Sequence, residues 1–354
     1  MQWGKFFFIF LLLPLVARAD STLKTFSQRY QEAKQGDASA QAIVGTAYHF
    51  GREASKGEQE VPRDYAKALY WYRKAAAQNY AIAYYQLGHM YRFGRGVNKD
   101  LTQAFQYTLK AAQLGFTESM LEVAYAYEIG EGVAKDKKKA FEWYKKSAEN
   151  GRGYKYLGLY YLYGIGTEKD EKKAFENFLK ASQVRKTDGA LFEQIAIMYD
   201  EGIGTERDYY QAFLFYKKAA EKGKAYSQYR LAKWYYFGKA NIISKDPEFA
   251  FAYAINAAKQ GQAEAQTLLG SMYIARKDYQ SAFYWISQAE NKDPHAQLYL
   301  GMIYEFGLFV IENLEKAKFH YQKACEQGVK EACEDVERFL NKKRETLAFL
   351  SIKP

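Results

Sequence analysis

The sequence predicts an all-α fold: a right-handed α-solenoid of about eight antiparallel helix pairs with a capping helix at each end. Three recurring features predict it. An aspartate stands four residues before an alanine in unit after unit, another small residue lies seven positions further on, and a tyrosine precedes each aspartate. The period runs from about 31 to 43 residues, mostly 34–38, which is the range of helix-pair repeats.

The recurring aspartate predicts the start of the second helix of each pair, called helix B. Asp and Asn are favoured there because the side chain accepts a hydrogen bond from an unpaired amide of the first turn. The two small residues that follow fall on one helical face, where they let a neighbouring helix approach closely. The helix starts are Asp64, Asp100, Asp136, Asp170, Asp208, Asp246, Asp278 and Asn313. The alanines four residues later are Ala68, Ala104, Ala140, Ala174, Ala212, Ala250, Ala282 and Ala317.

The first helix of each pair, helix A, is marked by a tyrosine. An aliphatic residue lies four positions before each of these tyrosines, and Gly or Ala stands next to that aliphatic residue. This spacing predicts a helix face that packs against a partner helix, so the tyrosines are explained by packing and need no cofactor. The marker tyrosines are Tyr48, Tyr91, Tyr127, Tyr161, Tyr199, Tyr235, Tyr273 and Tyr304.

The first residues of the chain do not fit the repeat. Lys5 precedes an apolar run at 6–16, and a small-x-small site ends at Ala19, which is typical of a secretory signal peptide. After cleavage following Ala19 we expect no transmembrane segment and a periplasmic or secreted protein. The predicted segments are a signal peptide at 1–19, an N-terminal capping helix at 20–36, the repeat array at 37–329, and a C-terminal capping helix and tail at 330–354.

The repeated phrase resembles the Sel1-like repeat, a relative of the tetratricopeptide repeat. The clearest copy, Ala81–Gly115, contains A-x-A-x-x-x-L-G-x-x-Y-x-x-G-x-G-V-x-x-D-x-x-x-A-F. The resemblance implies a helix-pair solenoid whose concave surface meets other molecules.

In tetratricopeptide relatives the concave surface is lined by helix A residues that do not pack within the array. By alignment these lie three before, one after and four after the Gly or Ala of helix A. Residue types vary sharply there, which fits a read-out surface and equally fits unconstrained solvent positions. The mixture of Tyr with Arg or Lys is typical of protein interfaces, so a protein or an extended peptide is the favoured partner. The candidate binding residues are Tyr85, His89, Arg92, Tyr125, Glu128, Lys155, Tyr229, Lys233 and Tyr236.

The charge balance leaves two interpretations open. Without Lys5 and Arg18 of the signal peptide, the formal net charge falls from +10 to +8. A positive chain favours anionic partners such as acidic proteins or cell-envelope glycans. The favoured interpretation is that the same lysines are simply the solvated outer faces of the B helices. Nucleic acid is not expected as a partner of an exported chain.

Two cysteines occur, Cys325 and Cys333. In an exported protein an even number of cysteines suggests a disulfide, and these two lie on consecutive antiparallel helices joined by a short turn. Free thiols are the alternative. Their spacing looks like that of the Helicobacter cysteine-rich branch of the Sel1 family, and that resemblance also implies a bridge.

The cysteine-rich branch is associated with penicillin binding and weak β-lactamase activity, so an enzyme is the alternative to a scaffold. A serine β-lactamase needs S-x-x-K together with S-D-N and K-T-G. The only S-x-x-K match is Ser21-Thr22-Leu23-Lys24, beside the cleavage site, and the other two motifs are absent. The four histidines lack metal-ligand spacing. We therefore expect no catalytic residues, no cofactor and no metal, and a non-catalytic adaptor of the bacterial cell envelope that holds protein partners.

Overall fold

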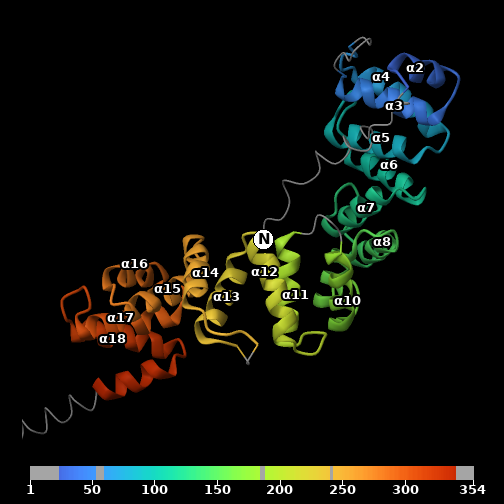
Figure 1. Cartoon of the computed structure of the whole chain (residues 1–354). Coiled ribbons are helices and arrows are strands. Elements are labelled where there is room, and N and C mark those ends of the chain that lie inside the picture. The colour runs from blue at the N-terminus through green and yellow to red at the C-terminus, as the bar shows by residue number, and fades with distance from the viewer. Residues whose placement is uncertain (1–23, 53–59, 184–187, 240–241, 340–354) are drawn as a thin grey trace, which may run out of the picture. The chain divides into compact units, whose positions relative to one another are not determined.

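The computed structural model describes residues 24–52, 60–183, 188–239 and 242–339. The chain forms two compact units, residues 1–169 and 170–354, and their helices are labelled in Figure 1. The predicted signal peptide, 1–19, and residues 340–354 of the predicted tail lie outside the described residues.

In the first unit each helix packs on the next along the chain. The lone helix α2 is followed by the A helices α3, α5, α7 and α9, which alternate with the B helices α4, α6 and α8. The bounds are α2 Phe26–Lys34, α3 Ala38–Phe50, α4 Tyr65–Ala77, α5 Ala81–Phe93, α6 Leu101–Gln113, α7 Thr117–Ile129, α8 Lys137–Glu149 and α9 Tyr154–Tyr163.

The second unit continues the alternation, with B helices at even numbers and A helices at odd ones. The bounds are α10 Glu171–Ser182, α11 Gly189–Glu201, α12 Tyr209–Glu221, α13 Ala225–Phe237, α14 Pro247–Lys259, α15 Ala263–Ala275, α16 Tyr279–Ala289, α17 Pro294–Phe306 and α18 Leu314–Glu326. A further helix covers 330–339.

Regular structure in the described residues is helical. Apart from helices there are two isolated β-bridges in the A–B links, Arg52–Val61 and Lys239–Ile243. The predicted all-α fold of stacked helix pairs is therefore confirmed. In the part of the chain that the structure describes, every helix is too short or too polar to cross a membrane.

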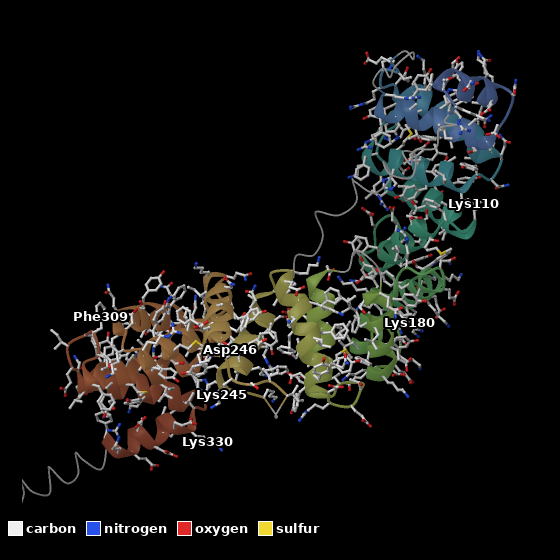
Figure 2. The ribbon with its side chains drawn as sticks, in the orientation of Figure 1. Lys110, Lys180, Lys245, Asp246, Phe309 and Lys330 are labelled. Carbon is white, nitrogen blue, oxygen red and sulfur yellow. A yellow bond between two sulfur atoms is a disulfide. The ribbon has the colours of Figure 1, made fainter. Side chains whose placement is uncertain are left out.

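The recurring Asp and Asn residues cap the B helices as predicted. Asp100, for example, accepts a hydrogen bond from the Gln103 amide at 3.0 Å through Oδ1. At α14, whose start is labelled in Figure 2, Asp246 accepts from two amides, and Pro247 occupies the first turn. The cap satisfies first-turn N–H groups that have no partner within the helix.

The capping residue also ties helix B to helix A. The Asp100 amide donates to the Tyr91 carbonyl oxygen at 2.9 Å, and the Asp246 amide donates to the Tyr235 carbonyl oxygen at 2.8 Å. The same bond joins each remaining pair that lies within one unit: Asp64 to Tyr48, Asp136 to Tyr127, Asp208 to Tyr199, Asp278 to Tyr273 and Asn313 to Tyr304. The phase of tyrosine and aspartate in the sequence thus reflects one backbone hydrogen bond.

The small residues lie where helices touch. The alanines four residues after each cap are at most 1 % exposed. On helix A, a Cβ added to Gly301 would lie 2.6 Å from the Tyr321 ring, and one added to Gly270 would lie 2.3 Å from the Ile286 side chain. Glycine at these points lets a bulky helix B side chain pack directly on the helix A backbone.

The second glycine of the A–B link packs against the preceding B helix. Gly132 has φ +71°, and a Cβ there would lie 2.0 Å from the Leu101 carbonyl oxygen. Gly204 makes the equivalent approach to the Glu171 carbonyl oxygen, also at 2.0 Å. The link of one repeat is therefore seated on the backbone of the repeat before it.

Substitution Gly132→Ala tests this contact against Gly115→Ala. Gly115 also has a positive φ, +88°, but nothing lies within 4 Å of an added Cβ. We expect Gly115→Ala to cost about 1–2 kcal/mol from backbone strain alone. Gly132→Ala should cost about 1–3 kcal/mol more, because the backbone must shift. The free energy of unfolding in urea measures both, and equal losses would contradict the close approach.

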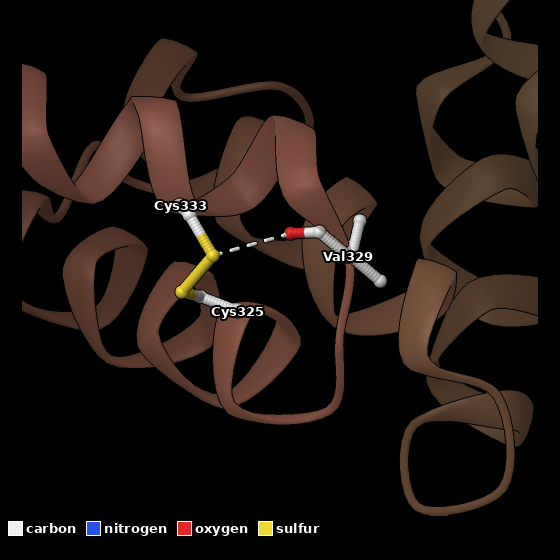
Figure 3. Close-up of a disulfide and its surroundings, with 3 residues drawn as sticks. All are labelled: Cys325, Val329 and Cys333. Atoms are coloured by element: carbon white, nitrogen blue, oxygen red, sulfur yellow. Dashed lines mark hydrogen bonds between the residues drawn. A yellow bond between two sulfur atoms is a disulfide. The ribbon is translucent and has the colours of Figure 1, made fainter.

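The last described helix is joined to α18 by a disulfide. Figure 3 shows the bond between Cys325 and Cys333. Their Cα–Cα distance is 4.7 Å, and the Cys333 Sγ lies 3.6 Å from the Val329 carbonyl oxygen. The interface beneath is apolar, with Ala332 and Val336 packing on the α18 residues Tyr321 and Ala324. The predicted disulfide is therefore present, and the alternative of two free thiols is not.

Replacing both cysteines by serine should destabilise the C-terminal end. Closing a loop this short is worth about 2–3 kcal/mol in the chain-entropy account. We expect the double variant, and the reduced wild type, to melt at a lower temperature than the oxidised protein by circular dichroism. Identical melting with and without reductant would show that the disulfide contributes nothing.

Candidate binding surface

Three of the predicted binding residues in α5 converge on one carboxylate of α7. The Tyr85 hydroxyl donates to Glu122 Oε1 at 3.0 Å, and Arg92 Nη1 donates to Glu122 Oε2 at 2.8 Å. His89 Nε2 lies 3.1 Å from Oε1. Glu122 is 5 % exposed and Tyr85 only 4 %. These groups therefore join two successive A helices, and the Tyr85 ring lies inside the repeat stack.

The three partners keep Glu122 ionised. Burial, the largest effect, would raise its pKa, but the hydrogen bond and charge of His89, the charge of Arg92 and the hydrogen bond from Tyr85 outweigh it. The pKa of Glu122 therefore lies below its ordinary value. For Tyr85, burial and the neighbouring carboxylate raise the pKa of the hydroxyl, so it stays a donor.

The second unit contains the same ion pair with its polarity reversed. Each pair joins two equivalent repeat positions. The first partner, Arg92 or Asp200, directly follows a marker tyrosine. The second partner, Glu122 or Arg230, directly precedes the aliphatic residue of the next helix A. In the first unit the arginine comes first and pairs with Glu122. In the second unit the aspartate comes first, is 6 % exposed, and pairs with Arg230. One structural position therefore carries either sign.

A carboxylate after the marker tyrosine has a further partner on helix B. Glu128 accepts from the Tyr144 hydroxyl at 2.7 Å and Asp200 from the Tyr216 hydroxyl at 3.1 Å. Glu305 accepts from the Tyr321 hydroxyl at 2.7 Å and also from Arg338 of helix 330–339. Each of these tyrosines lies eight residues after a helix B cap. Three other repeats have Thr108, Ala254 or Ile286 eight residues after the cap, and in these repeats the residue after the marker tyrosine is not acidic.

The other predicted binding residues lie nearer the surface. Tyr125 is 40 % exposed, Lys233 is exposed, and Lys155, Tyr229 and Tyr236 are half-buried. Burial, followed by the nearby carboxylates, raises the pKa of Tyr229 to about 12. A role in binding remains a prediction for all of them. In the part of the chain that the structure describes, no three His, Cys, Asp or Glu side chains are grouped to hold a metal ion.

A row of exposed apolar residues was missed by the alignment with tetratricopeptide relatives. The last residue of every A helix in the first unit is a large apolar one that faces solvent, and we call these four residues the apolar row: Phe50 at 52 %, Phe93 at 55 %, Ile129 at 48 % and Tyr163 at 64 % exposure. The signal was available, because each stands five residues after the Gly or Ala of helix A. In the second unit, Phe237 and Phe306 hold the same position and are also exposed.

His49 supports the start of this row. Its ring is 2 % exposed and stacks on Phe50 with 4.5 Å between ring centroids. Arg95 Nη1 lies 3.0 Å from His49 Nε2, and since the guanidinium is always a donor, this nitrogen accepts and the ring is neutral. Burial, followed by the charge of Arg95, lowers the pKa of His49 from 6.5 to about 4.

The protein should lose stability in acid through His49. Because the pKa is lower in the folded state, the contribution is complete above the unfolded pKa of about 6.5 and is lost as the pH falls to about 4. The loss is about 3 kcal/mol, from 1.36 kcal/mol per pKa unit. Urea unfolding of the wild type and of His49→Gln, which stays neutral, should show the decline reduced in the variant. An equal decline in both would contradict the assignment.

Glu122→Gln should destabilise the first unit by about 3–5 kcal/mol, because it leaves Arg92 without its buried counter-charge. The control is Glu131→Gln, since Glu131 also contacts Arg92, at 3.3 Å, but its side chain is 29 % exposed. That substitution should cost under about 1 kcal/mol. Chemical denaturation at neutral pH separates the two, and similar losses would show that burial of Glu122 is not decisive.

Comparison with known proteins agrees with the repeat seen in the helices. The Sel1 repeat matches residues 38–80, 81–116, 117–151, 153–183, 194–224, 225–262, 263–293 and 294–329. The crystal structure of c5321, a protective antigen present in uropathogenic Escherichia coli strains and displaying an SLR fold, is 31 % identical with a TM-score of 0.70, over 90 % of this chain and 68 % of that chain.

Two further proteins are similar. A Sel1 repeat protein from Oxalobacter formigenes shares the fold, with 24 % identity and a TM-score of 0.58 over 92 % of this chain and 99 % of that one. DAP3-binding cell death enhancer 1 of Rattus norvegicus is 35 % identical over 102 residues, which are 27 % of this chain and 20 % of that protein, so the match spans a fifth of that relative. Repeats of this kind generally form protein-interaction scaffolds rather than catalytic folds. With eight matched segments covering most of its length, the chain belongs to the Sel1 repeat family.

Proposed function

We propose that this protein is a non-catalytic adaptor of the bacterial cell envelope, periplasmic or secreted, which binds an extended segment of a partner protein. The apolar row of the first unit is the observation that carries the proposal. Single exposed apolar residues are ordinary on protein surfaces. Four of them at one repeat position, each about half exposed or more, give the surface a regular apolar pattern, which is typical of interaction sites.

The surroundings of the row are polar and largely fixed. Beside Phe93 lie Arg95, whose guanidinium is 5.2 Å from the ring centroid, and His89 at 5.8 Å between rings. Arg92 is held by Glu122 and Glu131. Apolar anchors next to charged groups that are already in position lose little side-chain entropy on binding. An extended peptide with apolar residues at intervals is the partner that such a surface suits.

The exported location rests on the sequence of residues 1–19, and it is supported by the disulfide between Cys325 and Cys333, because disulfides persist in oxidising compartments. Under this proposal the protein positions partners without chemically changing them. Nitrocefin and purified peptidoglycan should therefore not be turned over by the purified protein, and measurable turnover of either would favour the enzyme alternative.

Affinity purification from the envelope fraction followed by mass spectrometry tests the role of the apolar row. The variant Phe50→Ser/Phe93→Ser/Ile129→Ser/Tyr163→Ser should lose partners that the wild type recovers. The control is Tyr210→Ser/Tyr284→Ser, because these residues are on B helices and are 54 % and 56 % exposed. Circular dichroism confirms that both variants are folded. Equal recovery by the wild type and the row variant would overturn the proposal.

The same purification tests the groove positions taken from the tetratricopeptide relatives. Tyr125→Ser/Lys233→Ser changes two exposed residues of that set and leaves the buried Tyr85 in place. Loss of partners in this variant, with the apolar row intact, would place binding along the groove positions instead.

A further inference from the structure

A surface depression of about 250 Å³ lies between α2, α3 and α4 of the first unit. It is lined by Tyr30, Lys34, Tyr48, Lys67, Tyr70, Trp71 and Lys74. On α4 the residues 67, 70, 71 and 74 fall on one face, and on α2 the residues 30 and 34 do the same. Two stripes of lysine and aromatic residues therefore border one cavity.

The lining is positively charged and has no acidic side chain. Lys67 is partly neutralised by Asp64, 3.2 Å away. Lys34 and Lys74 are exposed and have no carboxylate within ion-pair distance in the described residues. Within the described residues, the lining thus presents the unpaired ammonium groups of Lys34 and Lys74, together with that of Lys67, which is paired with Asp64, the N-cap of α4.

Each ammonium group is held near an aromatic ring. Lys34 Nζ lies 4.8 Å from the Tyr30 ring centroid, Lys67 Nζ lies 5.3 Å from that of Tyr48, and Lys74 Nζ lies 4.9 Å from that of Tyr70. Cation–π contacts of this kind restrain a lysine that would otherwise be mobile. The Tyr70 side chain is also 51 % exposed, so its ring is accessible to a ligand.

This arrangement is absent from the next repeat. The residues of α6 at the positions of Lys67, Tyr70, Trp71 and Lys74 are Gln103, Gln106, Tyr107 and Lys110. Only the last position keeps its lysine, and the exposed ring is replaced by an amide. Parts of the pattern recur further along the chain, since α8 has Lys139, Trp143 and Lys146 at these positions and α18 has Lys316, Phe319 and Lys323. The depression in the first repeat is also lined by Tyr30 and Lys34 of α2.

We propose that this depression binds the acidic residue of an anionic saccharide, with Lys34 and Lys74 on its carboxylate or phosphate and the sugar ring against Tyr70. A cavity of this volume is smaller than the roughly 300–1,000 Å³ of sites that enclose a drug-sized ligand, so it suits one ring of a longer chain. Ammonium groups and aromatic faces match an acidic sugar ring. The lining offers no side-chain amide of the kind that commonly pairs with a peptide backbone. The site is independent of the apolar row.

Isothermal titration calorimetry with the whole chain after residues 1–19, the predicted signal peptide, tests the site. The probes are a galacturonic acid trimer, glucose 6-phosphate, neutral galactose, inorganic phosphate and a triglutamate peptide. We expect the trimer and the sugar phosphate to bind, galactose not to bind, and affinity to fall as salt is added. Tyr70→Ser should weaken the acidic sugars and leave inorganic phosphate unchanged.

Lysine variants test whether the saccharide binds in the depression. Lys34→Gln and Lys74→Gln should each weaken the trimer about tenfold, the effect of losing one charged hydrogen bond. Lys110→Gln is the matched control, since Lys110 occupies the position of Lys74 one repeat later (Figure 2), and it should change nothing. Equal losses in all three would show only general charge attraction. Absence of binding, equal binding of inorganic phosphate, or tighter binding of triglutamate would overturn the saccharide assignment.

Discussion

The hydrogen bond from the capping residue amide to the marker tyrosine carbonyl sets the geometry on which the other contacts depend. It brings the end of helix A to the start of helix B, while the same aspartate side chain completes the first turn of helix B. The link between the two residues is free to vary. Asp278 follows Tyr273 after five residues, whereas Asp64 follows Tyr48 after sixteen, and both pairs make the bond. Variable links are tolerated because the helix ends are fixed without them.

Once the pair is formed, the small residues and the buried carboxylates decide how neighbours stack. Alanines with almost no exposed surface bring helices close, and the second glycine of the link lies against the preceding B helix. Glu122, Asp200 and Glu305 then join helices through arginine and tyrosine. Since these groups are satisfied within the protein, they are not available to a partner, whereas the last residues of the A helices in the first unit are exposed.

The repeat architecture could be predicted from the sequence because its signals recur. Asp, Ala, Gly and Tyr occupy one phase along the chain, and each has a local physical role in capping or close packing. The surroundings of the candidate binding residues were harder to predict. Tyr85, His89 and Arg92 were expected in the groove, but their shared partner Glu122 is thirty or more residues away and follows no fixed repeat rule. A helix A residue that differs between repeats, such as Arg92, can face solvent or bind a neighbouring side chain. Which of these happens depends on the residue type at one position of the next repeat, here Glu122, and the repeat period does not predict that residue type.

The reversal of the inter-helix ion pair has a consequence for how the array assembles. Units with the same outline are liable to stack on the wrong neighbour during folding. If α13 docked beside α5, Arg230 would meet Arg92, and if α7 docked beside α11, Glu122 would meet Asp200. Both mispairings place like charges together in a poorly hydrated setting, where repulsion is strong. The opposite polarity of the two ion pairs therefore disfavours these two mispairings by charge.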